Sequence, residues 1–362
     1  MALLLTAASA LLSPPLPPSR AGSPRASATH DLLRADMDAA VAARGALERR
    51  LLGTPRPLGP PPGLGFSSAR GKAEAAELRR AGVVRLDGVL TPDCADELAA
   101  FVDAERERAE AEVSAGVPRQ SRFEDLVLVS RRCDLLLPLR GAAVRALDQL
   151  LGRNSRLAPL FREVMGERGV LNELACLFSE PGAAQQPLHP DTPYQKTPPL
   201  YAVFVALQDV SVDMGPTFYL PETHTKEAHE AFYGGSLEAG RRLCGEGTLK
   251  SNTPVNEEFL RGRVVQHALL KKGDCAVYNQ CVLHCGSANL SPHVRRQFYI
   301  SMYNPKVQVR AKRSMRPAFR NKLTLKDISA ELKALKGATS RPGGAFELLD
   351  AADRAEADSY LS

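Results

Sequence analysis

A succession of short strand-like runs in the second half of the chain constrains the fold more than any other feature. Apolar, β-branched and aromatic residues gather in runs that Gly, Pro and Asp separate: Val170 to Phe178, Leu200 to Leu207, Thr217 to Leu220, Ala276 to Tyr278 and Gln297 to Tyr303. Several short strands with turn residues between them are typical of an all-β sandwich or barrel. We therefore predict a mainly β core, interrupted by a mixed, partly helical insertion over residues 225–263.

Helical patterns precede this β region. Apolar residues recur at near-helical spacing over residues 31–52. Thr91-Pro92-Asp93 is expected to open another helix, with Thr91 as the N-cap and Pro92 in the first turn. The other elements predicted in this half are helices at 73–81, 141–151 and 157–165 and a strand at Val83–Leu86. Residues 53–65 are rich in Pro and Gly, which predicts a linker.

The first 30 residues are typical of a targeting segment, because they are rich in Ala, Ser, Leu and Pro and contain no acidic residue. Their Arg and Ser favour transit to a plastid or mitochondrion, while the apolar run from Ala2 to Leu12 leaves secretion as an alternative. No apolar run is long enough for a transmembrane helix. Seven scattered Cys residues do not suit a disulfide framework and fit a reducing compartment better.

The net charge of +6 is unevenly distributed. Residues 306–326 hold eight Lys and Arg residues and no acid, and the N-terminal segment adds Arg20 and Arg25, so the remainder is mildly acidic. A basic chain is therefore no argument for nucleic-acid binding by the domain itself. Residues 306–362 are expected to form a solvated basic extension, with contact to an anionic surface as an alternative role.

His189 and Asp191 in the segment Pro187-Leu188-His189-Pro190-Asp191 are the first candidate site residues. If this segment is extended, both side chains point to the same face. One imidazole and one carboxylate are two of the three usual protein ligands of non-haem iron(II). His284 is the best candidate for the third, because it follows a strand-like run and Gly286 can turn the chain after it.

The neighbouring His, Cys and Arg residues suggest other roles. The remaining His residues stand in loop-like or polar surroundings, and His224 is expected to be structural. Cys281 and Cys285 beside His284 could suggest zinc, but structural zinc takes four ligands and no second Cys pair stands nearby. Arg295 and Arg296 follow His284 by one loop and open the next strand-like run, where an Arg fork suits a carboxylate.

Four segments in this order resemble the phytanoyl-CoA dioxygenase family: P-L-H-x-D, G-P-T-F-Y-L-P-E-T-H, G-D-C-A-V-Y-N-Q-C-V-L-H-C-G-S-A-N and R-R-Q-F-Y. The resemblance covers roughly residues 80–305. It implies a double-stranded β-helix (jelly-roll, cupin-like) core with flanking helices, and dependence on iron(II) and 2-oxoglutarate. The dioxygenase domain is then expected over residues 73–305, after a helix and linker at 31–72.

The resemblance also assigns roles to residues. It implies His189, Asp191 and His284 as metal ligands and Arg295 as the partner of the 5-carboxylate of 2-oxoglutarate, with Arg296 facing away. The residues implied to lie beside the cosubstrate are Phe204, Cys176 and Tyr194. Where some relatives have a hydroxyl two residues after the distal His, this chain has Gly286, so Ser287 is the nearest substitute.

The implied activity is hydroxylation of a small-molecule or acyl substrate, with succinate and CO2 as coproducts. O2 would be the oxidant and ascorbate a candidate reductant. Halogenating relatives lack the carboxylate ligand, so Asp191 favours hydroxylation. The alternative is a jelly-roll binding protein without turnover, which would not need a cosubstrate anchor such as Arg295. The expected substrate loops, about 112–135 and 225–263, carry no signature of a particular substrate.

Overall fold

The computed structural model describes residues 42–59, 70–124, 131–237, 256–307, 314–337 and 345–359, together with Ala39. The predicted targeting segment, residues 1–30, lies outside these residues. Among the described helices, none combines the length and apolar character that a membrane span requires. The description that follows concerns residues 41–362, which form one compact unit.

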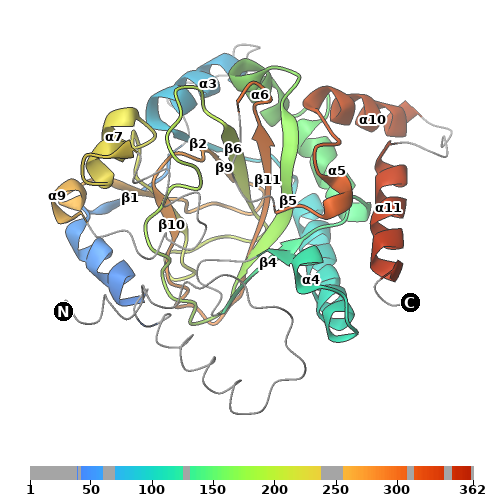
Figure 1. Cartoon of the computed structure of the whole chain (residues 1–362), viewed down its shortest axis with the longest axis horizontal. Helices are drawn as coiled ribbons and strands as arrows, with labels where there is room; N and C mark the ends of the chain where they lie inside the picture. Colours follow the sequence, from blue (N-terminus) through green and yellow to red (C-terminus); the bar gives the residue numbers. More distant parts are fainter. Residues whose placement is uncertain are drawn as a thin grey trace. The chain divides into compact units, whose positions relative to one another are not determined.

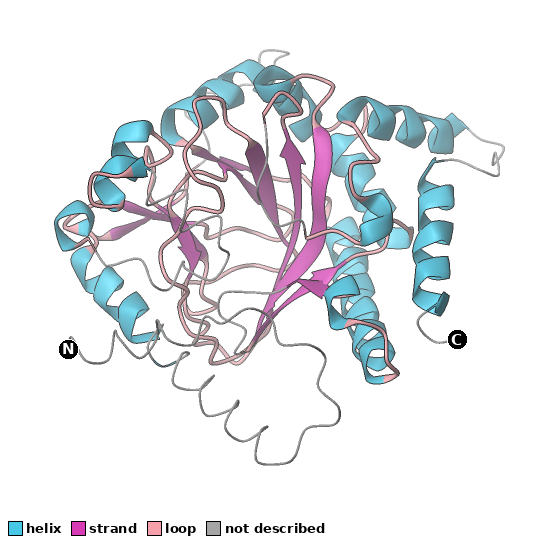
Figure 2. Ribbon diagram, in the orientation of Figure 1, coloured by secondary structure: helices cyan, strands magenta, loops and turns pink. Residues whose placement is uncertain are grey.

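Two β-sheets form the core of this unit (Figures 1 and 2). The larger sheet has the order β2-β9-β6-β11-β5-β4-β3. Its strands are β2 (Val83–Leu86), β3 (Phe123–Glu124), β4 (Arg132–Leu136), β5 (Val170–Ser179), β6 (Leu200–Ala206), β9 (Cys275–Asn279) and β11 (Arg295–Tyr303). The smaller sheet has the order β1-β8-β7-β10. Its strands are β1 (Pro55–Pro57), β7 (Thr217–Tyr219), β8 (Val265–His267) and β10 (His284–Gly286).

The pairing within the sheets is antiparallel except between β1 and β8. Residues from the inner faces of both sheets, such as Ala202, Tyr219 and Tyr278, share one apolar cluster. Side chains alternate along a strand, so Val203 and Val277 lie on the outer face of the larger sheet and pack in the main core. The predicted double-stranded β-helix core is confirmed.

Helices cover the outer faces of both sheets. The helices are α3 (Arg70–Ala81), α4 (Pro92–Ser114), α5 (Gly141–Leu151), α6 (Leu157–Met165), α7 (Lys226–Phe232), α9 (Glu257–Leu260), α10 (Leu325–Gly337) and α11 (Ala345–Ser359), with 3-10 turns η1 (Arg119–Ser121) and η2 (Pro317–Phe319). Residues of α3 to α6, α10 and α11 join the core against the larger sheet. Residues of α7 and α9 pack against the smaller sheet, beside β1 and β10 in Figure 1. The α4 N-cap is as predicted, since Thr91 Oγ1 accepts from the Cys94 amide at 3.3 Å.

Two segments differ from the expectations. Residues 55–57, predicted to be part of a linker, pair with β8 as β1, and Leu58 is buried. The C-terminal residues are no solvated extension where the structure describes them, because Met315, Phe319 and Ile328 are buried in the main core. The charge count of this segment concealed the apolar residues that lie between its Lys and Arg residues.

Candidate active site

Two backbone hydrogen bonds place His189 opposite His284. His284 begins β10, and His189 lies in the extended segment between β5 and β6. The His189 amide donates to the His284 carbonyl at 3.0 Å, and the reverse bond measures 2.9 Å. Two residues later, the Asp191 amide donates to the carbonyl of Gln280 at 2.9 Å. The jelly roll therefore fixes the backbone of all three predicted ligands.

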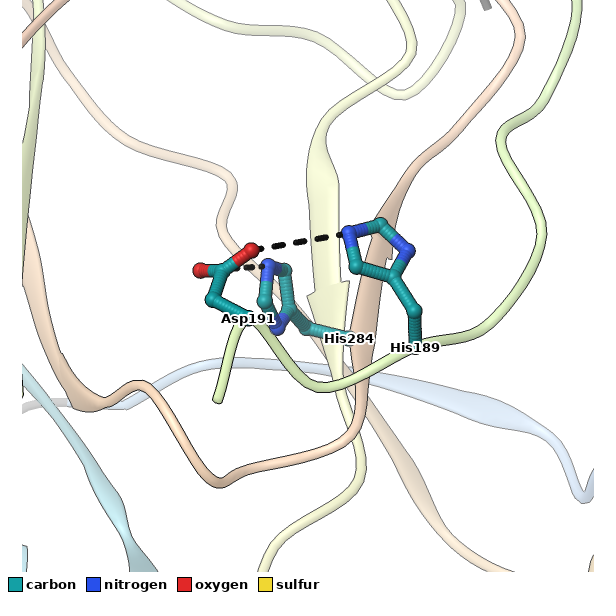
Figure 3. Close-up of side chains that lie close together, drawn as sticks. All are labelled: His189, Asp191 and His284. Carbon is teal, nitrogen blue, oxygen red and sulfur yellow. Dashed lines mark ion pairs between the residues drawn. The ribbon is translucent and has the colours of Figure 1, made fainter. Parts of the chain in front are cut away.

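The side chains of His189, Asp191 and His284 converge (Figure 3). Their candidate ligand atoms lie within 4.8 Å of one another. The Asp191 carboxylate lies 3.7 Å from Nε2 of His189 and 3.4 Å from Nε2 of His284. Ligand atoms on one face of a metal bound at about 2.1 Å would lie about 3 Å apart, so only small shifts are required.

The Nδ1 atoms of both histidines are engaged elsewhere. His189 Nδ1 lies 2.7 Å from the Pro187 carbonyl, and His284 Nδ1 lies 2.9 Å from the Val282 carbonyl. Such a bond fixes the proton on Nδ1 and leaves the Nε2 lone pair for a metal. The donor set of two imidazoles and one carboxylate therefore fits non-haem iron(II).

Tyr278 supports the carboxylate ligand, a role that the sequence reasoning missed. Its hydroxyl donates to Oδ2 of Asp191 at 2.9 Å. Burial, and next the charge of Asp191, raise the pKa of Tyr278 well above its ordinary value, so the hydroxyl keeps its proton. Tyr278 is on the inner face of β9, and its alternation with Val277 is the signal that could have indicated it.

His229 of α7 connects the two segments that carry the ligands. Its Nδ1 lies 3.3 Å from the amide of Tyr194, and its Nε2 lies 2.7 Å from the carbonyl of Cys281. One neutral tautomer satisfies both contacts, and burial lowers the pKa of His229, which favours the neutral form. Tyr194 is half-buried beside this ring, with 6.2 Å between the ring centroids. The structure thus places Tyr194 next to the ligand loop.

A buried carboxylate from the N-terminal helical residues 42–51 holds the segment before His189. Glu48 Oε2 accepts from the Leu188 amide at 2.9 Å. Burial raises the pKa of Glu48, although the neighbouring Arg44 acts in the opposite direction. This helix, which precedes the region of family resemblance, is therefore part of the site's support.

A small cavity lies between Arg295 and Tyr219, whose ring contacts the triad residue His284. Its lining includes Phe204, Thr217, Tyr219, Arg295 and Gln297. At the triad end, the Tyr219 ring stacks against His284 with 5.9 Å between centroids. Arg295 is only 1% exposed. Burial, and next the charge of Arg132, lower the pKa of Arg295 to about 9.

Strand alternation separates Arg295 from Arg296. Arg295 points inward, whereas Arg296 forms an ion pair with Asp103 of α4 at 2.6 Å. Phe204 also points inward, where its ring meets the ring of Tyr278 at 5.1 Å. Arg295 and Phe204 therefore line the same cavity, and Arg296, which also borders this cavity, directs its guanidinium to α4.

Three predicted cosubstrate residues do not line this cavity, namely Tyr194, which lies beside the ligand loop, Cys176 and Ser287. Cys176 packs in the main core on the outer face of β5, which corrects its assignment. Both faces of β5 are buried, so the sequence shows no alternation that reveals the side chain's direction. Ser287 does not line the cavity either. Its backbone carbonyl accepts a hydrogen bond from Arg132 at 2.9 Å. Thr217, which pairs with Gly286 across β7 and β10, lines the cavity together with Arg295.

Two further carboxylates lie on the inner face near the triad. Asp134 Oδ2 accepts from the Tyr299 hydroxyl at 2.7 Å and from the Ser314 hydroxyl at 3.0 Å. Glu173 Oε2 accepts from Gln280 at 3.0 Å. Burial raises the pKa of Asp134 to about 7 and that of Glu173 to about 7. Both side chains can therefore carry or release a proton near neutral pH.

The remaining candidates lie outside the site. His224 Nε2 lies 2.9 Å from the Arg79 carbonyl, which agrees with a structural role. Within the described ranges, the group of metal-ligating side chains is His189, Asp191 and His284, without Cys281 or Cys285.

Comparison with known proteins assigns the family. The model of the phytanoyl-CoA dioxygenase (PhyH) family matches residues 78–297, more than half of the chain. The chain belongs to the phytanoyl-CoA dioxygenase family. The matched range contains all three triad residues and Arg295 of this family member. No curated protein gives a match to the sequence.

Solved structures show distant likeness to this family member. The epimerase SnoN, in complex with Fe3+, alpha-ketoglutarate and nogalamycin RO, is 18% identical, with coverage of 76% of this chain and 94% of SnoN and a TM-score of 0.45. AviO1 from Streptomyces viridochromogenes Tue57 is 18% identical, with coverage of 68% and 100% and a TM-score of 0.44. HygX from Streptomyces hygroscopicus, with nickel, 2-oxoglutarate and hygromycin B bound, is 13% identical, with coverage of 70% and 98% and a TM-score of 0.41.

Proposed function

We propose that this protein is an iron(II)- and 2-oxoglutarate-dependent dioxygenase that hydroxylates a small-molecule or acyl substrate. The observation that carries the proposal is the arrangement of His189, Asp191 and His284, with both Nε2 atoms turned to one carboxylate. Membership in the phytanoyl-CoA dioxygenase family supports it. A 2-oxoglutarate-dependent enzyme also needs a binding site for its anionic cosubstrate, and the cavity lined by Arg295 supports this part of the proposal.

The residues of the chain have separable tasks in this reaction. His189, Asp191 and His284 would hold iron(II), which supplies O2 activation and the oxidative decarboxylation of 2-oxoglutarate to succinate and CO2. Tyr278 orients the Asp191 carboxylate through its hydrogen bond. Arg295 and Thr217 would bind the carboxylate of 2-oxoglutarate that lies farthest from the metal, because an Arg fork matches that group.

The inner face of the jelly roll excludes water from the cosubstrate. Phe204 and Tyr278 of the larger sheet and Tyr219 of the smaller sheet form an aromatic wall beside His284, with adjacent ring centroids 5.1 and 5.2 Å apart. Because apolar rings exclude water and lower the local dielectric constant, they strengthen the attraction between Arg295 and a carboxylate. The presence of the Asp191 ligand favours hydroxylation over halogenation, since halogenating relatives lack this carboxylate.

Succinate formation tests the proposal. We expect the purified protein, given 2-oxoglutarate, iron(II), ascorbate and O2, to form succinate slowly even without its substrate. Asp191→Ala should abolish this turnover, and Lys322→Ala, at an exposed site, should retain it. Absence of both succinate formation and 2-oxoglutarate binding in the wild-type protein would refute the enzyme and favour a binding protein without turnover.

The substrate requires a separate experiment. Incubation of the active protein with metabolite extracts, followed by mass spectrometry, should reveal a compound that gains one oxygen atom. The gain should depend on 2-oxoglutarate and disappear with Asp191→Ala. A product that gains no oxygen, for example a stereoisomer of its precursor, would contradict hydroxylation while leaving the cofactor assignment intact.

A further inference from the structure

Arg132 and Arg295 are two buried guanidinium groups that meet at one hydroxyl. Ser179 of β5 lies opposite Arg132 on β4 and opposite Arg295 on β11. The Ser179 hydroxyl accepts from Nη1 of Arg132 and, at 3.3 Å, from Nη2 of Arg295. The two arginines are 4% and 1% exposed. The interior therefore contains two neighbouring cations in one row across three strands.

No carboxylate of the described chain lies within ion-pair distance of either cation. The other acceptors are uncharged: the Gly215 carbonyl for Arg295, and the carbonyls of Ala184 and Ser287 for Arg132. Among the residues that the structure describes, the Nε atom of each arginine has no hydrogen-bond partner. Burial is the main cause that lowers the pKa of Arg132 to about 10 and that of Arg295 to about 9.

Two adjacent buried cations destabilise the folded protein unless an anion lies beside them. A buried charge without a counterion carries a desolvation penalty of several kcal/mol or more, and here like charges also repel. An anion that enters the cavity beside Arg295 would relieve both costs. Both cations contribute to this desolvation and repulsion energy. The charge of Arg132 should therefore strengthen the binding of an anion that only Arg295 contacts.

Gly286 explains how the chain accommodates the second arginine. A Cβ atom on Gly286 would lie 3.3 Å from Nη1 of Arg132 and 2.9 Å from Oε1 of Gln186. Any side chain at this position, including the hydroxyl of some relatives, would press on the Arg132 guanidinium. The chain therefore has Gly and not a hydroxyl residue two positions after His284, because the Arg132 guanidinium occupies the space that a side chain there would need.

We propose that Arg132 is a positioning residue for 2-oxoglutarate. It raises the affinity of the protein for 2-oxoglutarate relative to 2-oxo acids that lack a second negative charge. It acts through Ser179, which orients the Arg295 guanidinium, and through the positive potential that it adds behind Arg295. This inference rests on the proposed function, because Arg295 is its point of contact with the cosubstrate. It assigns to β4 a share in cosubstrate selection.

Binding of two matched ligands tests the role. Calorimetry would measure the dissociation constants of 2-oxoglutarate and 2-oxoglutaramate, whose far end is an uncharged amide, with Mn(II)-loaded protein. Arg132→Gln should weaken 2-oxoglutarate binding by about tenfold, with less than about a twofold effect on 2-oxoglutaramate. Arg131→Gln, at the exposed neighbouring position, should change neither. Arg132→Lys should restore most of the preference, because it keeps the charge.

The outcomes separate this inference from the proposed function. Equal weakening of both ligands by Arg132→Gln would indicate a structural role alone and overturn the inference, as would an unchanged preference. If Arg132→Gln does not fold, Gly286→Ala tests the same point by crowding Arg132, and an unchanged preference overturns the inference again. If the wild-type protein binds neither ligand, the proposed function fails and the inference fails with it.

Discussion

The hydroxyl of Tyr278 should account for a measurable part of the metal affinity. Tyr278→Phe removes one oxygen atom and keeps the ring that packs 4.8 Å from His284 and 5.1 Å from Phe204. The lost bond is the 2.9 Å donation to Oδ2 of Asp191. A hydrogen bond to a charged group contributes about 1.5–3 kcal/mol, which corresponds to a loss of about tenfold to a hundredfold in metal affinity, the range typical of groups behind metal ligands.

Tyr219→Phe is the matched control for this prediction. Tyr219 is also fully buried and stacks on His284, but its hydroxyl has no hydrogen-bond partner in the described part of the chain. Calorimetric titration with Mn(II), without 2-oxoglutarate, should show weakened binding for Tyr278→Phe and an affinity within about twofold of the wild type for Tyr219→Phe. Equal losses in both variants, or none in Tyr278→Phe, would refute the argument that the hydrogen bond orients Asp191.

Three further predictions concern stability. Since its folded-state pKa is raised to about 7, Asp134 should make the protein less stable as pH rises from about 4 to about 7; urea unfolding at pH 5 and 8 should show a smaller decline for Asp134→Asn, and an identical decline would contradict the assignment. His229→Leu leaves the Tyr194 amide and Cys281 carbonyl without their partner and should cost about 1–3 kcal/mol in unfolding free energy, whereas a loss under about 0.5 kcal/mol would exclude a supporting role. Arg316→Met removes the ion-pair partner of buried Asp353, while Glu105 keeps Arg140, and should cost about 3–5 kcal/mol in denaturant unfolding; a cost no larger than that of exposed Lys322→Met would show that this pairing contributes little.

The triad could be predicted because its geometry depends on local features of the sequence. His189 and Asp191 share a short extended segment, and a strand-like run marks His284 as the partner. Arg295 could be separated from Arg296 by strand alternation alone. The short strands predicted an all-β sandwich or barrel for the same reason, since each run is bounded by its own turn residues, and the family resemblance specified the jelly roll.

The supporting residues depend on long-range packing and could not be read from the sequence. Tyr278 reaches Asp191, and His229 reaches Cys281, only after distant segments have folded together. Arg132 meets Arg295 through strand pairing across β5. The misplacement of Cys176 has another cause, because a strand buried on both faces hides its alternation.

The C-terminal segment shows how a charge count can mislead. Eight basic residues over 306–326 suggested a solvated extension. Arg316 instead reaches into the interior, where Asp353 of α11 and Glu105 of α4 neutralise it. Apolar residues at helical spacing, such as Ile328 and Leu332, pack α10 against the core. This spacing is visible in the sequence and indicates a packed helix despite the many basic residues nearby.

The central claim is that His189, Asp191 and His284 hold iron next to a 2-oxoglutarate site that ends at Arg295. An anaerobic crystal structure with iron(II) and 2-oxoglutarate, with anomalous diffraction at the iron edge, tests it most directly. We predict one iron peak bonded to Nε2 of both histidines and to the Asp191 carboxylate, with the far carboxylate of 2-oxoglutarate against Arg295. Iron bound at other residues, or through Nδ1, would contradict the account.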